Sequence, residues 1–425
     1  MKLKQVRVDG YKNLINAVLD LGDFNVLVGP NNSGKSNLFE AIRMLWPICF
    51  GDDTFREAVL KGLTPPPRLG LSVCHLDQHG GKPLRIGLNF DLVVNQDIWK
   101  VTYDVALQCS FEEKEKRGFL SEILTGKHPS ARGPAIEYIN REREKLKVMG
   151  EEHPIAKDIS ALLAIKSLYP EFKDLPTEFE QFVRAIGQVG NTNVFAFSAT
   201  NLMDSIRKEK DIRGLRIAGF DLLLILDQVK QEDKYFNLFT ETLCDILNLK
   251  EVRFVAHDAP KLGEKEKAKV HQRRERYMFI NRSKEDWCSI DECSDGTIVV
   301  AAILASVLSA GRNEPLVCIE EPENYLHPAA LQKLLNFLQD HSDKWPVLIT
   351  THSPYLLNCV KNVEDIAVAV VDDSGATRFD KVKNTKQLRD YLKSDFMSIG
   401  DMLPSNFEDV LGGQRSVNTK PQASQ

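Results

Sequence analysis

The stretch Gly29-Pro30-Asn31-Asn32-Ser33-Gly34-Lys35-Ser36 decides the fold of this chain. It matches the pattern G-x-x-x-x-G-K-[ST] and lies between an apolar run, 24–28, and an amphipathic segment, 37–45. A strand, a glycine-rich turn and a helix in this order are the context that supports such a motif. Glycines let backbone N–H groups approach phosphates closely, and the helix start directs its positive end at them. The stretch therefore predicts a phosphate-binding loop.

Two side chains of this loop are expected to act on a nucleotide. Lys35 reaches the β- and γ-phosphates, and the Ser36 hydroxyl is a ligand of magnesium. The cofactors that follow are ATP and Mg²⁺. The residues expected to line the phosphates are Gly29, Asn31, Asn32, Ser33, Gly34, Lys35, Ser36 and Asn37.

A second signal is the apolar run 316–319, which ends in the adjacent carboxylates Glu320 and Glu321. Phosphate hydrolysis needs one carboxylate in the magnesium shell and another that orients and deprotonates water. We assign Glu320 to the metal and Glu321 to the water. The alternative is a pair of acidic residues solvated at a strand end, which the phosphate loop makes the weaker interpretation.

The apolar runs alternate with helical segments, and this alternation predicts a parallel sheet covered by helices. Segments of period two predict antiparallel strands elsewhere, so the sheet is mixed and the fold class is α/β. The segments predicted as strands are 4–8, 18–21, 24–28, 84–94, 98–109, 252–255, 277–280, 316–319 and 347–350.

Composition divides the chain into four parts. Residues 1–110 and 215–411 are expected to form two lobes of one packed domain. Between them, residues 111–214 shift to charged helix formers and predict a mainly helical insertion. Residues 412–425 are polar and predict a disordered tail.

Charge and hydrophobicity limit the partners. Lysine and arginine number 55 against 60 acidic residues, so no global field draws the chain to nucleic acid or membrane. The longest apolar run, 298–310, is shorter than the ~20 residues that span a bilayer. The closest cysteines, Cys288 and Cys293, lack the second Cys/His pair of a zinc site and predict free thiols. We expect a cytoplasmic protein without membrane contact.

Three further motifs carry a family resemblance. Ser294-Asp295-Gly296-Thr297 resembles the signature motif of ABC-type ATPases, 322–328 resembles their D-loop region, and Thr350-Thr351-His352-Ser353-Pro354 resembles their switch histidine. With the phosphate loop and the carboxylates, their order resembles the heads of SMC, RecF and OLD-like proteins. The likeness covers about half of the chain.

The resemblance implies a shared site. In ABC heads the signature meets the γ-phosphate of the partner subunit, so Ser294 and Gly296 are expected to complete the partner's site in a homodimer or higher homo-oligomer. His352 is expected to contact the γ-phosphate. The alternatives are that Ser294 is only a helix cap and that His352 is a strand-end histidine with a structural partner.

Two features depart from the family. Glu320 stands where most ABC proteins have Asp, so hydrolysis is expected to be slow. The glutamine-loop residue stays open between Gln78, Gln96 and Gln108.

The segment after His352 is short for the TOPRIM nuclease domain that OLD nucleases append. The chain resembles standalone ATPase subunits of anti-phage systems such as PARIS, Septu and the Rlo operons. Our leading hypothesis is a sensor or scaffold ATPase that controls a separately encoded effector, expected to be a nuclease.

The alternative is a RecF-like DNA-repair ATPase that clamps DNA. Residues 261–276 hold seven basic residues, among them Arg273, Arg274 and Arg276. Interleaved glutamates and a lack of stacking aromatics within this stretch favour a solvated hairpin over DNA contact. A transporter subunit is a weaker third reading, because nothing suggests coupling to membrane helices.

Overall fold

The central sheet carries the phosphate loop and has six strands in the order β10-β14-β15-β3-β16-β17. All neighbours are parallel except β16 and β17. The strands are β10 (Val194–Ala196), β14 (Val317–Glu320), β15 (Val347–Thr351), β3 (Phe24–Val28), β16 (Ile366–Val371) and β17 (Thr377–Lys381). The predicted parallel core of an α/β fold is therefore confirmed. The computed structural model describes residues 1–61, 83–110, 113–168, 175–190, 194–196, 222–258, 274–283, 286–310 and 315–382.

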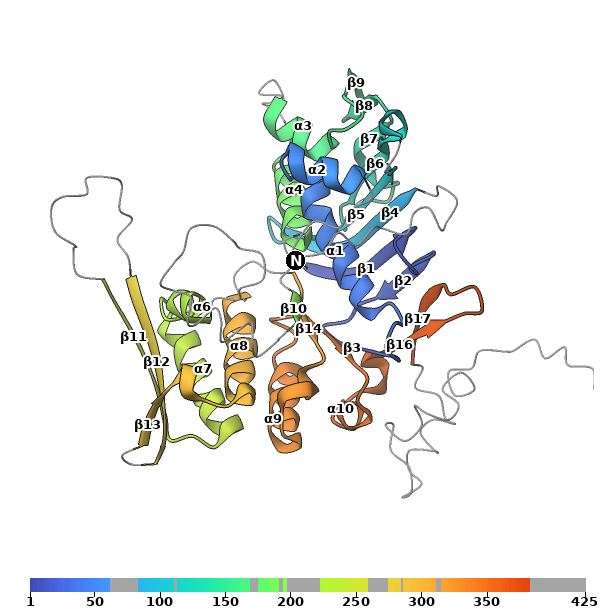
Figure 1. Ribbon diagram of the computed structural model, residues 1–425. Coiled ribbons are helices and arrows are strands. Elements are labelled where there is room, and N and C mark those ends of the chain that lie inside the picture. The colour runs from blue at the N-terminus through green and yellow to red at the C-terminus, as the bar shows by residue number, and fades with distance from the viewer. Residues whose placement is uncertain are drawn as a thin grey trace, which may run out of the picture.

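This sheet is buried on both faces, which explains its nearly continuous apolar runs. Leu27 and Leu348 belong to one hydrophobic core, while Val26 and Ile349 belong to the other. The alternation is the period of two that a strand imposes on its side chains. Helix α1 (Lys35–Cys49) packs in the first core, and α8, α9 and α10 pack in the second (Figure 1).

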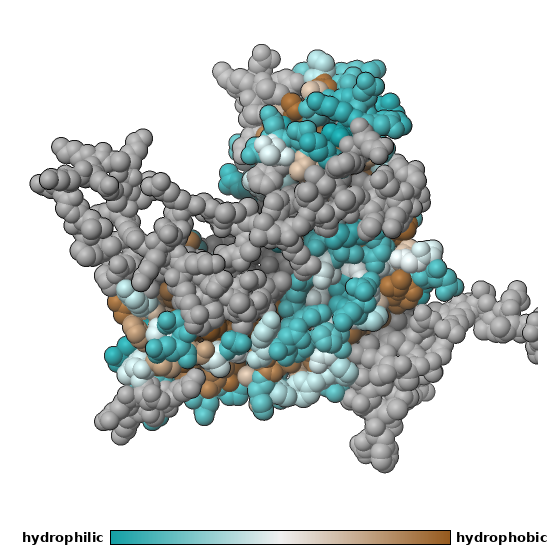
Figure 2. All heavy atoms as spheres, in the orientation of Figure 1, coloured by the Kyte–Doolittle hydropathy of each residue, from teal (hydrophilic) through white to brown (hydrophobic). Residues whose placement is uncertain are grey.

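The second core is built from helices and a small sheet. The strands predicted at 252–255 and 277–280 are confirmed, and the three strands of this sheet follow one another as antiparallel neighbours. The elements are α6 (Leu222–Val229), α7 (Asp233–Leu247), α8 (Asp295–Ala310), α9 (Pro328–Asp340), α10 (Pro354–Asn358), β11 (Glu251–Asp258), β12 (Arg274–Ser283) and β13 (Asp286–Ser289). Hydrophobic residues reach the surface at this end of the molecule (Figure 2), and the cross-strand neighbours Val255 and Tyr277 are exposed.

The first core lies between α1 and an eight-stranded antiparallel sheet of order β2-β1-β4-β5-β6-β7-β8-β9. The strands are β1 (Lys2–Asp9), β2 (Ala17–Asp20), β4 (Leu84–Val94), β5 (Asp97–Gln108), β6 (Gly118–Lys127), β7 (Ile136–Glu142), β8 (Lys145–Val148) and β9 (Glu151–Pro154). Helices α2 (Asp53–Leu60), α3 (Ala161–Leu168) and α4 (Thr177–Gly190) accompany them. The strands predicted at 4–8 and 18–21 are confirmed and pair as a hairpin, and the long strands predicted at 84–94 and 98–109 are confirmed as antiparallel neighbours.

The expectation that residues 111–214 are mainly helical is wrong for 118–154. Four strands form there and extend the sheet from β5. Their charged residues alternate with buried ones, as in β8, where Leu146 and Val148 are buried between exposed lysines. The chain turns tightly between the last two of these strands, where Gly150 adopts φ 91° between β8 and β9. Helices α3 and α4 follow only after residue 160.

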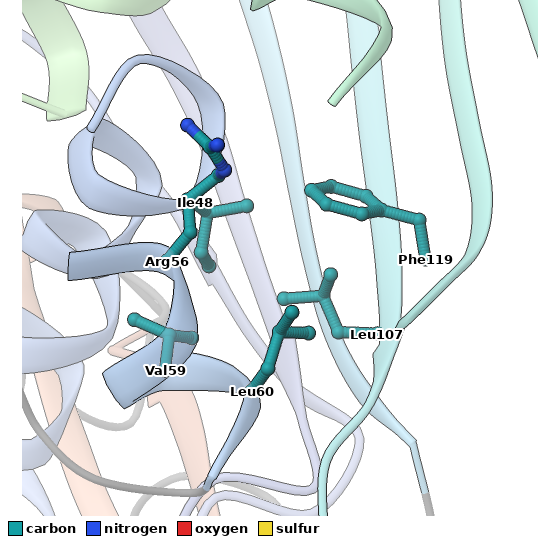
Figure 3. A pocket seen from close by; sticks show the side chains of 6 residues that line it. All are labelled: Ile48, Arg56, Val59, Leu60, Leu107 and Phe119. Carbon is teal, nitrogen blue, oxygen red and sulfur yellow. The ribbon is translucent and has the colours of Figure 1, made fainter. Parts of the chain in front are cut away.

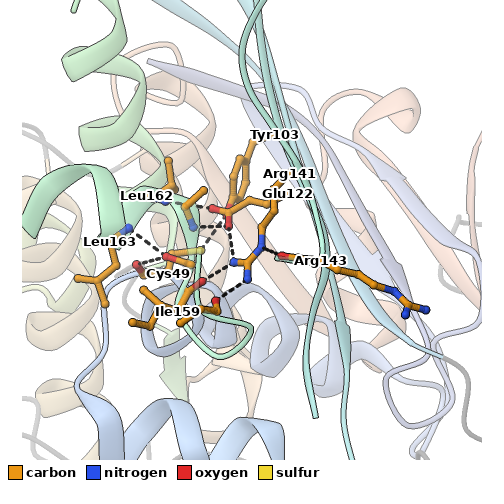
Figure 4. Close-up of polar contacts among 11 residues, drawn as sticks. Cys49, Tyr103, Glu122, Arg141, Arg143, Ile159, Leu162 and Leu163 are labelled. Carbon is orange, nitrogen blue, oxygen red and sulfur yellow. Dashed lines mark hydrogen bonds and ion pairs between the residues drawn. The ribbon is translucent and has the colours of Figure 1, made fainter. Parts of the chain in front are cut away.

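A buried polar cluster joins this sheet to the end of α1 (Figure 4). Glu122 and Arg141 are fully buried and lie 3.9 Å apart. Glu122 accepts hydrogen bonds from Tyr103 Oη (2.9 Å) and from the Ala161 amide (2.6 Å) at the start of α3. The Tyr103 hydroxyl also lies 3.0 Å from the Cys49 thiol, the last residue of α1. The cluster therefore ties α1, the sheet and α3 together.

Three expectations concern residues with limited or no description. The tail 412–425, Gln78 and Arg273 lie outside the described residues, whereas Gln96 lies in the turn between β4 and β5 and Gln108 ends β5. The choice of glutamine-loop residue stays open. No helix within the described ranges is long and apolar enough to cross a membrane.

Candidate active site

The phosphate loop joins β3 to α1, as its sequence predicts. Gly34 adopts φ 86° as the N-cap residue of α1, and Asn32 adopts φ 66°. A Cβ added at Gly34 would lie 2.9 Å from Thr377 Oγ1 and 3.0 Å from Asn13 Oδ1. Both the backbone angle and the close neighbours therefore require glycine at this position.

Lys35 is the first residue of α1, and its side chain folds back along the loop. The Nζ atom donates to the Gly29 carbonyl (2.7 Å) and to the Pro30 carbonyl (2.8 Å). Burial lowers the pKa of Lys35, and the charges of Glu321, Glu323 and Glu320 oppose that shift. The ammonium group is therefore stabilised electrostatically by Glu320 at the end of β14 and by Glu321 and Glu323 just after it.

Two residues that the motifs do not include, Asn13 and Thr377, hold the phosphate loop by hydrogen bonds to its carbonyl groups. Asn13 donates to Thr377 Oγ1 (2.8 Å) and to the Asn32 carbonyl (3.3 Å). Thr377 in turn donates to the Ser33 carbonyl (3.1 Å), and Asn37 donates to Asn13 Oδ1 (2.7 Å). No local pattern marks Asn13 or Thr377, because each acts through a partner distant in the chain.

The carboxylates lie beside β15, which separates β14 from β3. Glu320 is half-buried at the end of β14, and Glu321 takes the left-handed conformation with φ 44°. The Glu321 amide donates to the Thr350 carbonyl (2.9 Å), while its Oε2 accepts from Asn324 Nδ2 (3.0 Å). Because parallel strands end at the same edge, Glu320, Glu321 and the phosphate loop share one edge of the sheet.

His352 lies at this edge too, one residue beyond β15. Its Nδ1 is 3.3 Å from Glu321 Oε1 and 3.9 Å from Glu323 Oε1. The His352 side chain is 44% exposed, so the ring remains accessible. Ser353 caps α10 by accepting from the Leu356 amide (3.4 Å), and Pro354 is the first residue of this helix.

The signature residues stand at the start of α8. Ser294 is exposed, with its hydroxyl 3.0 Å from that of Thr297. A Cβ added at Gly296 would meet the Tyr325 carbonyl at 2.7 Å, so glycine lets α8 approach the turn η5 (Pro322–Tyr325). The signature therefore lies beside the segment that carries the carboxylates.

Family models match two overlapping parts of the chain. Residues 1–212 match the model described as "AAA ATPase domain". Residues 200–358 match the model described as "AAA domain, putative AbiEii toxin, Type IV TA system". The two matches together span residues 1–358, and both models describe AAA domains. No curated protein matches the chain.

Solved structures similar to this chain include three SMC heads. The SMC head domain from Thermotoga maritima has 13% identity and a TM-score of 0.40, with 90% of this chain and 100% of that chain covered. The SmcHead bound to the C-winged helix domain of ScpA has 14% identity and a TM-score of 0.47, and the match covers 92% of this chain and 100% of that chain. The third structure is the Smc head domain with an extended coiled coil bound to the C-terminal domain of ScpA, derived from Pyrococcus furiosus. It has 11% identity and a TM-score of 0.42, and the match covers 92% of this chain and 98% of that chain. These likenesses are too weak to carry a function or a partner over to this chain.

The oxygen ligands available beside the phosphate loop suit magnesium. Ser36 and Glu320 offer oxygen atoms, which Mg²⁺ prefers, and both side chains are half-buried. No cluster of three or more His, Cys, Asp or Glu able to hold a metal occurs in the described part of the chain. Magnesium is usually bound by one or two protein groups together with phosphates, so two residues suffice.

A mostly apolar recess lies near the C-terminal end of α1, next to α2, β5 and β6 (Figure 3). It is lined by Ile48, Arg56, Val59, Leu60, Leu107 and Phe119. The Arg56 guanidinium is already bound to the Gly51 carbonyl and to Asp53. This recess therefore offers no free cation for a phosphate.

Proposed function

We propose that this chain binds and hydrolyses ATP with Mg²⁺ at the edge formed by the phosphate loop, Glu320, Glu321 and His352. The observation that carries the proposal is that the phosphate loop, Glu320 and Glu321 meet at one edge of the sheet, with His352 Nδ1 3.3 Å from Glu321 Oε1. Lys35 and the loop amides hold the phosphates, and Ser36 and Glu320 hold magnesium, which neutralises phosphate charge when bound. Glu321 accepts the proton of the attacking water.

We further propose that two copies complete each other's sites. The exposed hydroxyl of Ser294 supports a signature face that is open to a second chain, whereas the glycine at position 296 is explained by its packing against η5 of the same chain. Tyr325 and Tyr355, which follow Glu321 and His352 in sequence, are 36% and 40% exposed. Burial of such side chains against a second copy is favourable.

The Glu321→Gln variant tests hydrolysis. It keeps the shape of the side chain but removes the base, so turnover is expected to fall at least ~100-fold while ATP stays bound and holds the dimer. Phosphate release and light scattering measure the two effects. Glu241→Gln, the same change on an exposed residue of α7, is the control. Near-normal turnover of Glu321→Gln would move the base to another group.

For the cellular role, we propose a sensor or scaffold subunit of an anti-phage system with a separately encoded effector, a nuclease by expectation. The match to a domain family described with a toxin of a toxin–antitoxin system supports this choice. Expression with the neighbouring genes, followed by phage challenge, tests it. Protection is expected with the native chain and not with Glu321→Gln, and copurification identifies the effector.

The second candidate is a DNA clamp of the RecF type. The aromatics absent from 261–276 are supplied beside it, since Tyr277 and Phe279 stack at 6.3 Å between ring centroids. The Arg253 guanidinium also lies 4.3 Å from the Trp287 ring. Aromatic rings beside basic residues are typical of nucleic-acid surfaces. DNA affinity that falls steeply between 50 and 200 mM salt would favour this candidate over the effector-controlling ATPase.

A further inference from the structure

Glu323 is a buried carboxylate of the η5 turn to which the sequence motifs assign no role. Its side chain is 9% exposed. Its Oε1 accepts hydrogen bonds from the Thr351 hydroxyl and from the His352 amide, the latter at 3.2 Å. Glu323 therefore connects the carboxylate segment to the corner that carries His352.

The second oxygen of this carboxylate, Oε2, is buried and has no hydrogen-bond partner within the described part of the chain. A buried polar atom without a partner costs stability, so each such atom needs an explanation. An apolar side chain would avoid that cost but would release the two donors held by Oε1. The arrangement favours precise placement of the corner over stability.

The corner is fixed on two further sides. The Thr351 carbonyl accepts from the Gly29 amide of the phosphate loop (3.4 Å). The Thr351 hydroxyl, which donates to Glu323, accepts from the Ser353 amide (2.9 Å). With its backbone held in this way, the His352 ring meets Glu321 at 3.3 Å.

We propose that Glu323 is a positioning residue for ATP hydrolysis, which holds the Thr351–His352 corner so that His352 orients Glu321 toward the attacking water. Glu323 acts through His352 and does not itself contact the nucleotide. This inference rests on the proposed function. A displacement of about 1 Å in a catalytic group can lower a rate by ~100-fold, so the loss of this support should be measurable.

The Glu323→Ala variant is expected to lower kcat by ~10- to 100-fold while the Kd for ATP changes less than ~3-fold. Glu323→Gln keeps an acceptor for both donors and is expected to recover part of the loss. Glu364→Ala is the matched control, because Glu364 takes the second position of another short turn, η6 (Val363–Asp365), and is exposed. Its kcat should equal that of the unchanged protein.

A double variant tests the route through His352. Adding Glu323→Ala to His352→Ala should lower kcat by no more than ~2-fold beyond His352→Ala alone, because one unit has already been lost. If the double variant lost the product of the two single-variant losses in kcat, the two residues would act independently and the inference would be overturned. An equal change in kcat and in ATP affinity in Glu323→Ala would overturn it too. If Glu323→Ala does not fold, the same criteria apply to Glu323→Met, which fills a similar volume but accepts neither hydrogen bond. Normal kcat in a folded variant overturns this inference alone, whereas absence of turnover in the unchanged protein overturns the proposed function as well.

Discussion

At the scale of single residues, the charge of Lys35 is maintained by its neighbours and little by water. The residue is 6% exposed, and its Nζ is bonded to two carbonyls of its own loop. Burial lowers the pKa of Lys35, while three carboxylates favour its charged form. Removal of this ammonium would leave those carboxylates close together without their cation.

Lys35→Ala is expected to weaken ATP binding at least ~100-fold. Charge-assisted hydrogen bonds contribute about 1.5–3 kcal/mol each, and like charges at the site would add repulsion to the phosphates. Calorimetric titration with ATP measures the affinity. Lys344→Ala, in an exposed turn, is the control and should bind ATP normally. Unchanged affinity of folded Lys35→Ala would remove the phosphate-loop assignment.

Local motifs identified Lys35, Glu321 and His352 as candidates, because their spacing within short segments carries the information. Asn13 and Thr377 escaped prediction for a physical reason. Their hydrogen bond joins positions 364 apart, and neither residue type is unusual in its own segment. In the sequence Glu323 is only a second acidic residue after Glu321, because its partners Thr351 and His352 lie at the end of another strand, β15.

At the scale of elements, burial explains which predictions succeeded. β3 and β15 are buried along their whole length, so their apolar runs identify them. The strands between 118 and 154 were not predicted, because one face of them is largely exposed and carries charged residues. Such residues are also common in helices. Glu122 and Arg141 were ordinary charged residues in sequence, but pairing across β6 and β7 buries them.

Arg141→Ala is expected to destabilise the protein by ~3–5 kcal/mol, because it leaves Glu122 buried without its cation. It also removes donors from three carbonyls, those of Arg143, Ala156 and Ile159. Denaturant unfolding measures the loss. Arg132→Ala, at an exposed position between β6 and β7, should change stability by less than ~0.5 kcal/mol. Equal stability of the two variants would show that the buried cluster adds nothing.

At the scale of the whole molecule, the central sheet separates two cores and brings the motifs to one edge. The N-terminal segments supply the phosphate loop, and the C-terminal segments supply the carboxylates, His352 and the signature. Ser294 is exposed at the start of α8, where a second copy can reach it. A site shared between two chains predicts that lesions in different copies compensate.

Ser294→Arg is expected to leave ATP binding to the phosphate loop intact but to block hydrolysis, because Arg is too large to meet a phosphate at the helix start. In a mixed dimer with Lys35→Ala, one composite site carries both changes and the other carries neither. Partial ATPase activity should therefore return on mixing, once subunit exchange has been shown. Ser130→Arg, at an exposed turn, is the control. Parental activity of Ser294→Arg alone would refute the shared site.

The position of β3 sets an order of events during synthesis. Its two neighbours in the sheet are β15 and β16, and Thr377 closes the loop that follows it. A ribosome adds about 5–20 residues per second, so the 344 residues from Ser33 to Thr377 take roughly 20–70 s. For most of that interval β3 has neither neighbour beside it, because β15 begins at Val347 and β16 at Ile366. The nascent chain must therefore keep an apolar strand from aggregating, and the proposed nucleotide site can form only after β15, β16 and Thr377 have been made.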